Sequence, residues 1–259
     1  MPVGFDFSSK MVLVTGASRG IGYGVAQGFA NAGADVTILS ESDEIDAAAA
    51  ALSAECGRAV RAIRCDIADP AAVDRAFAGI DRIDVLVNNA GYERMTPVVG
   101  ATSETDDTFR RIIDINVMGT WYVTRAAVPK MGRGARIIVT ASIWGRTAVA
   151  GFAAYCASKH ANLGFMRSLS KELGPRGITV NAICPGWVRT DAAMRSLKLV
   201  SAAAGKTEEE ALDEILAAQS LDGLMEPADI AATYLFLASD AAANVTGQAL
   251  NVDRGEVMS

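Results

Sequence analysis

The chain has 259 residues and a net charge of −6, and 51% of its residues are hydrophobic. This length suits one α/β domain with a sizeable core. The sequence has no basic run, which argues against a nucleic-acid-binding surface, and no stretch approaches the roughly 18 apolar residues of a membrane span. Because the first ten residues also lack the apolar segment of a signal peptide, we expect a cytoplasmic protein that binds neither nucleic acid nor membrane.

Apolar runs rich in β-branched residues alternate with helical patterns along the chain. The expected strands are 11–15, 35–39, 60–64, 83–87, 135–140, 178–183 and 248–252, and the expected helices are 20–32, 43–56, 70–78, 104–130, 153–174 and 227–238. This alternation predicts an α/β fold with a doubly wound, mostly parallel, Rossmann-like sheet. Because no linker or repeat interrupts it, we expect residues 1–259 to form a single domain.

The first strand runs into a glycine-rich turn, with Gly16, Gly20 and Gly22, and a helical pattern follows. Strand, glycine turn and helix are the context of a dinucleotide-binding turn. Glycines let the backbone approach a pyrophosphate, and the helix N-terminus favours its negative charge. The spacing is G-x-x-x-G-x-G and not the commoner G-x-G-x-x-G, and a glycine turn alone could be a plain strand–helix connection.

Tyr155 and Lys159 are four residues apart in a helical pattern, with Ser142 upstream. Residues at this spacing lie on the same face of a helix. A fixed ammonium stabilises phenolate and lowers the pKa of a tyrosine, so the pair can act as one acid/base unit. Ser142 can donate a hydrogen bond to an oxygen held near Tyr155. Such a pair also occurs by chance on solvated helices, and the glycine turn is the independent second signal.

The cysteines and the single histidine show no metal or disulfide pattern. Cys56, Cys65, Cys156 and Cys184 lack C-x-x-C spacing, so we expect reduced, mostly buried thiols and no metal. His160 is the only histidine. A Ser-His-Asp hydrolase would have to use it, whereas a helix-surface or interface role is the simpler interpretation.

Taken together, these motifs resemble the classical short-chain dehydrogenase/reductase family. The matching segments are T-G-A-S-R-G-I-G at 15–22, N-N-A-G at 88–91, I-N-V-M-G around Asn116, Ser142, Tyr155 with Lys159, and P-G-W-V-R-T at 185–190. They occur in the family's order over nearly the whole chain. The resemblance implies a nicotinamide cofactor and hydride transfer to or from a carbonyl or alcohol carbon.

The resemblance also implies roles for individual residues. Tyr155 would move the proton, Lys159 would tune it and bind the nicotinamide ribose, Ser142 would orient the substrate oxygen, and Asn116 would hold a proton-relaying water. The implied cofactor-binding residues are Gly16, Ser18, Arg19, Gly20, Ile21, Gly22, Ser40, Glu41, Asp66, Ile67, Asn89, Ala90, Gly91, Tyr155, Lys159, Pro185, Gly186, Val188 and Thr190.

The residues after the second strand leave the choice of cofactor open. A carboxylate there accepts hydrogen bonds from a ribose 2′-OH, whereas arginine attracts a 2′-phosphate. Similar NAD-dependent enzymes have aspartate where Ser40 stands, and similar NADP-dependent enzymes have arginine near Glu41. Arg19 favours the phosphate and Glu41 disfavours it, so the sequence favours NAD by a small margin over NADP.

The substrate is expected to be a small polar or cyclic alcohol or ketone, such as a sugar, polyol or hydroxy acid. The expected substrate-binding residues are Ser142, Trp144, Arg146, Glu93, Arg94, Trp187 and Met194. Residues 191–227 depart from the strand–helix alternation, and the resemblance favours a substrate-loop insertion there over an ordinary surface helix pair. Because family members generally form tetramers, we expect a homotetramer, with a dimer as the alternative.

Two other functions stay open. One is a 3-oxoacyl-carrier-protein reductase of the same family, for which Arg110, Arg111 and Arg125 could form the carrier surface. The other is a catalytically silent nucleotide sensor. The chain also departs from the family's usual pattern at Arg254, where a second glycine is common.

Overall fold

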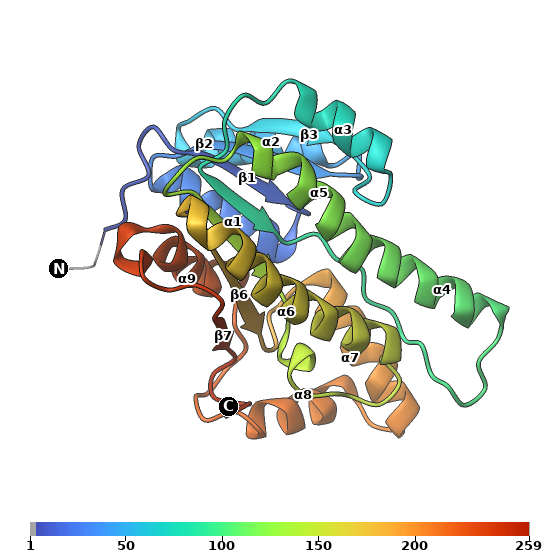
Figure 1. The fold of residues 1–259 in the computed structure, drawn as a ribbon. Helices are drawn as coiled ribbons and strands as arrows, with labels where there is room; N and C mark the ends of the chain where they lie inside the picture. The colour runs from blue at the N-terminus through green and yellow to red at the C-terminus, as the bar shows by residue number, and fades with distance from the viewer. Residues whose placement is uncertain (1–3, 259) are drawn as a thin grey trace.

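The computed structural model describes residues 4–258 and contains one seven-stranded sheet in the order β3-β2-β1-β4-β5-β6-β7 (Figure 1). The strands are β1 (Met11–Thr15), β2 (Asp35–Ser40), β3 (Arg61–Arg64), β4 (Val85–Asn88), β5 (Arg136–Thr140), β6 (Thr179–Pro185) and β7 (Ala249–Val252). Every neighbouring pair is parallel. The predicted α/β class is therefore confirmed; residues 1–3 and 259 of the expected single domain lie outside the described residues.

Helices cover both faces of the sheet. They are α1 (Gly20–Asn31), α2 (Ile45–Cys56), α3 (Pro70–Ala78), α4 (Ser103–Ile113), α5 (Thr120–Ala127), α6 (Ala153–Leu173), α7 (Asp191–Ala204), α8 (Glu208–Ala217) and α9 (Pro227–Ala238). Phe29 of α1 and Tyr234 of α9 belong to the core on one face, and Phe77 of α3 and Leu163 of α6 belong to the core on the other. Parallel strands buried on both faces carry the continuous apolar runs seen in this sequence.

The helix expected over 104–130 is not continuous. It divides into α4, a π-helical segment (Asp114–Gly119), α5 and a short 3-10 turn (Val128–Lys130). A Cβ on Gly119 would lie 2.7 Å from the side chain of Ile67, so the chain passes close to the loop after β3 here. Insertions of π-helix inside α-helices are frequent at functional sites, and this one contains Asn116.

Residues 191–227 form α7, α8 and a return to α9. Thr190 caps α7 by accepting a 3.2 Å hydrogen bond from the N–H of Ala193. A short parallel bridge between Val188 and Met225 brings the two ends of the segment together. The segment is therefore a compact helix pair that begins and ends at the carboxyl end of β6. No helix within residues 4–258 is both long and apolar enough to cross a membrane.

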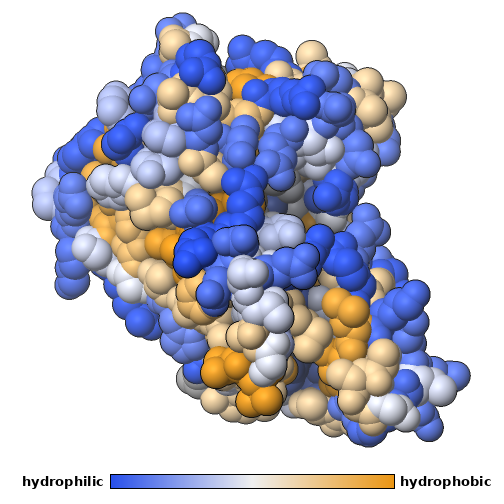
Figure 2. All heavy atoms as spheres, turned by 90° about the vertical axis from the view of Figure 1, so that its right-hand side faces the viewer, coloured by the Kyte–Doolittle hydropathy of each residue, from blue (hydrophilic) through white to orange (hydrophobic). Residues whose placement is uncertain are grey.

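Exposed hydrophobic side chains are concentrated on a few segments. Phe109 lies on α4 and Trp121 on α5, and they are 39% and 45% exposed. The loop before α4 carries Val98 and Val99, which are almost fully exposed. Figure 2 shows hydrophobic residues gathered in the lower part of the face that it views, with hydrophilic residues above.

Candidate active site

A cavity of about 410 Å³ lies at the carboxyl ends of the parallel strands. Strand order reverses between β1 and β4, and ligands of open α/β sheets bind at such a switch point. The loops after β1, β2, β3, β4, β5 and β6 all contribute to its wall, as does the start of α7. One cavity thus joins the glycine turn to Tyr155 and Lys159.

The glycine turn adopts a conformation that needs glycine. Gly16 and Gly20 have φ values of +65° and +59°, a region that side chains rarely enter. A Cβ on Gly22 would lie 2.3 Å from the Gly16 carbonyl oxygen and 2.5 Å from Asn89 Nδ2, so the helix, the turn and the loop after β4 are in direct contact.

Asn89 fixes this turn to the neighbouring strand. Its Nδ2 donates to the carbonyl oxygens of Thr15 at 3.0 Å and Gly16 at 3.1 Å. Within the described part of the chain, no side chain caps the start of α1, where Gly20 and Ile21 line the cavity. Uncapped helix N–H groups beside a glycine turn suit a pyrophosphate, so the residues present fit a dinucleotide.

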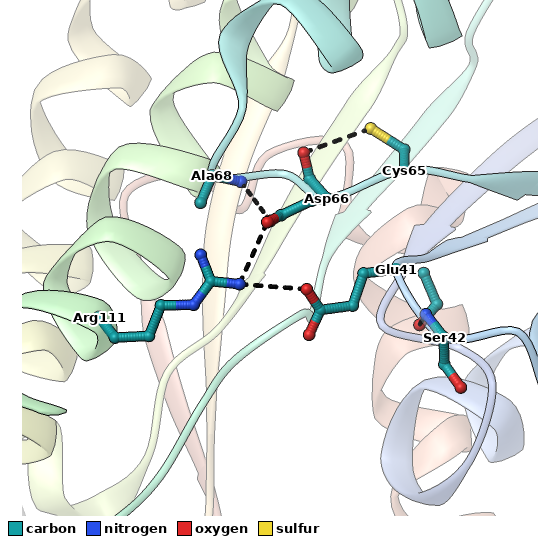
Figure 3. Close-up of polar contacts among 7 residues, drawn as sticks. Glu41, Ser42, Cys65, Asp66, Ala68 and Arg111 are labelled. Atoms are coloured by element: carbon teal, nitrogen blue, oxygen red, sulfur yellow. Dashed lines mark hydrogen bonds and ion pairs between the residues drawn. The ribbon is translucent and has the colours of Figure 1, made fainter.

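Three charged residues, Glu41, Asp66 and Arg111, meet where the loops after β2 and β3 form the cavity wall (Figure 3). Nη2 of Arg111 lies 3.1 Å from Oε2 of Glu41 and 3.1 Å from Oδ2 of Asp66. Arg19 is directed instead to Glu44, at 2.6 Å. The position of Arg111 beside these carboxylates was not predicted; its place one helical turn before Ile115, which lines the cavity, is the signal that could have indicated it.

Ser142, Tyr155 and Lys159 meet at the opposite end of the cavity. Ser142 follows β5, and its Oγ accepts a 3.1 Å hydrogen bond from the N–H of Trp144. Nζ of Lys159 donates to the carbonyl of Thr140 at 2.8 Å and lies 5.4 Å from the centre of the Tyr155 ring. The three residue types therefore converge as predicted.

The pKa of Tyr155 is raised in this structure, whereas from the sequence we expected it to be lowered. Burial, and next the negative charge of Glu93, raise the pKa of Tyr155 above its usual value, while the hydrogen bond from Ser142 opposes this. Burial also lowers the pKa of Lys159 to about 8. Desolvation is the largest influence on the pKa of Tyr155 here, and the effect of Lys159 on that pKa stays a prediction.

Asn116 lies behind the cavity and not on its wall. It is fully buried, and its Nδ2 donates to the carbonyl of Tyr92 at 3.0 Å and to Ser158 Oγ at 2.9 Å. Its backbone carbonyl accepts a 2.8 Å hydrogen bond from Thr120 Oγ1. The predicted water relay through Asn116 remains a prediction.

Aromatic rings form one wall of the substrate end. Trp144 is in edge-to-face contact with Tyr155 and with Trp187, with ring centres 6.0 Å apart in each case, and packs against Phe152 at 5.3 Å. The guanidinium of Arg94 lies 4.5 Å from the centre of the Tyr92 ring. Trp144, Trp187 and Arg94 all line the cavity, as predicted.

Glu93 is the acidic group of this end. Ser196 of α7 donates a hydrogen bond to its Oε1. Burial raises the pKa of Glu93, and Ser196 and the nearby Arg195 and Arg94 oppose this shift. The start of α7 is therefore joined to the loop after β4 across the cavity.

Two predicted substrate residues do not line the cavity. Arg146 donates a hydrogen bond to the carbonyl of Ala249, and Met194 is not among the wall residues although its neighbours Ala193 and Arg195 are. The remaining predicted cofactor residues on the wall are Ser18, Ser40, Ile67, Ala90, Gly91, Pro185, Gly186, Val188 and Thr190. Wall residues that the sequence did not predict include Thr140, Ile143, Asp191, Arg195 and Ser196.

Among residues 4–258, no cluster of potential ligands is placed to hold a metal ion.

A Rossmann-like sheet with a glycine turn at one end of its cavity and a Ser, Tyr and Lys set at the other defines a nucleotide-dependent oxidoreductase. The family described as Enoyl-(Acyl carrier protein) reductase matches residues 16–256. The chain belongs to the short-chain dehydrogenase/reductase family of oxidoreductases.

Two curated relatives cover nearly the whole chain. Oxidoreductase UcpA of Salmonella typhimurium is 39% identical over 97% of this chain and 95% of its own length. The 3-oxoacyl-[acyl-carrier-protein] reductase of a Synechocystis strain is 36% identical over 97% of this chain and 98% of its own length.

Solved structures of similar proteins contain either nucleotide. L-sorbose reductase from Gluconobacter frateurii, complexed with NADPH and L-sorbose, is 27% identical with a TM-score of 0.88 over 99% of this chain and 100% of that chain. Carveol dehydrogenase from Mycobacterium avium, in complex with NAD, is 29% identical with a TM-score of 0.89 over 97% of this chain and 99% of that chain.

Proposed function

We propose that the chain is an NAD(P)-dependent alcohol dehydrogenase or carbonyl reductase acting on a small polar or cyclic alcohol or ketone of the sugar, polyol or hydroxy acid class. The convergence of Ser142, Tyr155 and Lys159 at one end of a single cavity, with the glycine turn at the other, carries this proposal. The nicotinamide cofactor, when bound, supplies or accepts the hydride, and the protein supplies placement and a proton.

Each residue of the set has a defined task. Because the pKa of Tyr155 is raised, its hydroxyl is protonated near neutral pH and can donate a proton to a substrate carbonyl oxygen. Ser142 lines the same end of the cavity and can donate a hydrogen bond to the same oxygen. Lys159 is held by Thr140 beside Gly91, where a bound nicotinamide ribose would lie.

The segment 191–227 supports a substrate-loop role. Its first helix lines the cavity through Ala193, Arg195 and Ser196, and Ser196 is hydrogen-bonded to Glu93. Segments that cover an active site in this way can open and close over a substrate. We propose NAD as the slightly favoured cofactor, because the chain offers Glu41 after β2, with NADP as the alternative.

The carrier-protein reductase is the second candidate, and it is favoured by the Synechocystis relative. The three arginines expected to form its carrier surface are occupied: Arg110 pairs with Asp107, Arg125 with Asp74, and Arg111 with two carboxylates. Two tryptophans also line the cavity. The silent nucleotide sensor is the third candidate, and it has no use for the complete Ser, Tyr and Lys set.

The experiment is a screen of reduced-nicotinamide absorbance with alcohols, polyols, sugars, hydroxy acids and a 3-oxoacyl thioester, using each cofactor in parallel. We expect turnover of a small polar substrate. Turnover of the thioester alone would favour the second candidate. Tight cofactor binding with no turnover of any substrate would favour the sensor.

We also propose a homotetramer. Phe109 and Trp121 are exposed hydrophobic residues on α4 and α5, and Trp121 packs edge-to-face on Phe165 of α6, so one apolar surface spans these helices. Light scattering of the wild type should give four chains, and Trp121→Glu should give a smaller assembly. A wild-type monomer would contradict the proposal.

A further inference from the structure

Glu41, Asp66 and Arg111 form a charged cluster that the sequence did not predict (Figure 3). A single guanidinium nitrogen of Arg111 lies 3.1 Å from a carboxylate oxygen of Glu41 and 3.1 Å from one of Asp66. Glu41 follows β2, Asp66 follows β3, and Arg111 belongs to the last turn of α4. All three segments meet at the end of the cavity where Glu41 and Asp66 line the wall.

The two carboxylates are held differently. Oδ1 of Asp66 also accepts a 2.9 Å hydrogen bond from the N–H of Ala68, so its orientation is fixed by the backbone. Among residues 4–258, Arg111 is the only cation paired with Glu41. The nearby Arg19 is paired with Glu44 instead. The position of the Glu41 charge therefore depends on Arg111.

The contact is easy to rearrange. The side chains of Arg111 and Glu41 are 40% and 57% exposed, and ion pairs at such sites contribute little to stability. An unpaired carboxylate after the second strand accepts hydrogen bonds from a ribose 2′-OH and repels a 2′-phosphate. The shared guanidinium of Arg111 offsets one of the two carboxylate charges, so the cluster presents a smaller negative charge to the ligand than Glu41 and Asp66 would alone.

We infer that Arg111 is a specificity-determining residue of the nucleotide site: by pairing with Glu41, it offsets one carboxylate charge and weakens the repulsion of a 2′-phosphate. This inference rests on the proposed nucleotide-dependent function, because it assumes that the adenosine end of the cofactor lies at this cluster. It predicts that the ratio of affinities for the two cofactors depends on a residue of α4.

The test compares two ligands that differ only in the 2′-phosphate, adenosine 2′,5′-bisphosphate and 5′-AMP. Calorimetry measures the affinity of each for the wild type, Arg111→Gln and the control Arg110→Gln, whose arginine is the next one along α4 and pairs with Asp107. We expect Arg111→Gln to weaken the bisphosphate by about tenfold, as for the loss of one charge pair near a surface. Binding of 5′-AMP should change by less than twofold, and Arg110→Gln should change neither affinity.

A second pair of variants tests whether Arg111 acts through Glu41. In a Glu41→Gln background, adding Arg111→Gln should lower the affinity ratio by less than it does in the wild type, because only the pair with Asp66 is then lost. An equal fall in the ratio in both backgrounds would overturn the inference, because Arg111 would then act independently of Glu41. Equal weakening of both ligands by Arg111→Gln, or an effect matched by Arg110→Gln, would also overturn it. Failure of the wild type to bind either ligand would overturn the nucleotide site along with the inference, which is a distinct result.

Discussion

The side chain of Asn116 binds both backbone groups of Tyr92, accepting from its N–H at 2.7 Å and donating to its carbonyl at 3.0 Å. Asn116 belongs to the π-helical segment between α4 and α5, and Tyr92 belongs to the loop after β4. A third hydrogen bond joins Asn116 to Ser158 of α6. This buried amide thus fixes the loop that carries Gly91, whose Cβ position lies 3.5 Å from Asn116 Oδ1 and 3.6 Å from Lys159 Nζ.

Asn116→Ala should therefore destabilise the protein and disturb the loop. It removes three hydrogen bonds, two of them to the part-buried backbone groups of Tyr92, and leaving a buried polar group unsatisfied costs about 1–3 kcal/mol. We expect a fall of about 2–4 kcal/mol in the free energy of unfolding, measured by urea denaturation. Thr102→Ala, which removes the exposed N-cap of α4, is the control and should cost only about 1 kcal/mol. A wild-type midpoint for Asn116→Ala would contradict the positioning role.

Gly22→Ala should weaken nucleotide binding by steric conflict. Its Cβ would lie 2.3 Å from the Gly16 carbonyl oxygen and 2.5 Å from Asn89 Nδ2, so the turn must move. Forcing an extra methyl group into a packed site costs about 1–3 kcal/mol, and we expect a loss of affinity of about tenfold or more. Gly79→Ala is the matched control, because nothing lies within 4 Å of its Cβ position. Calorimetry with each cofactor makes the comparison.

Tyr155→Phe should reduce turnover to less than a few per cent of wild type while leaving cofactor affinity within about twofold, because it removes only the proton donor. Tyr23→Phe controls for the loss of a hydroxyl, since Tyr23 is bonded to Glu55 outside the cavity. Steady-state rates and calorimetry measure the two effects separately. Substantial turnover by Tyr155→Phe would show that another group moves the proton.

Glu93→Gln should shift the pH dependence of alcohol oxidation. In that direction the deprotonated form of Tyr155 is active, so the rate rises with pH through the pKa of Tyr155. The charge of Glu93 raises this pKa, and its removal should lower the pKa and move the rising limb to lower pH. Glu104→Gln, in the exposed first turn of α4, is the control. An unmoved limb in pH–rate profiles would mean that Glu93 does not act on Tyr155.

Lys159 predicts a pH dependence of stability. Its pKa is lowered to about 8 by burial, whereas an exposed lysine in the unfolded chain titrates near 10.4. Between these values the unfolded chain binds more protons than the folded protein, so this residue makes stability rise with pH. Lys159→Met should remove that rise, measured as the change in the free energy of unfolding of the cofactor-free protein from pH 8 to pH 10. A parallel rise in both proteins would assign the effect to other groups.

The strand–helix alternation, the glycine turn, and the convergence of Ser142, Tyr155 and Lys159 could all be predicted from the sequence. These features depend on local periodicity and turn chemistry, and on the rule that parallel strands present their carboxyl ends at one edge. The observed strands and helices follow the predicted ranges closely. The break of the long helix at 114–119 was not predicted, because it depends on packing against Ile67 and on buried hydrogen bonds of Asn116.

The long-range polar contacts, in contrast, could be seen only in the folded structure. Arg111 lies 70 residues from Glu41, Glu93 lies 103 residues from Ser196, and Arg146 lies 103 residues from the Ala249 carbonyl that it binds. No local pattern encodes such contacts, since they depend on how helices and loops pack around the sheet. The raised pKa of Tyr155 has the same origin: its spacing to Lys159 is local, but the desolvation that governs its proton comes from the whole of the surrounding fold.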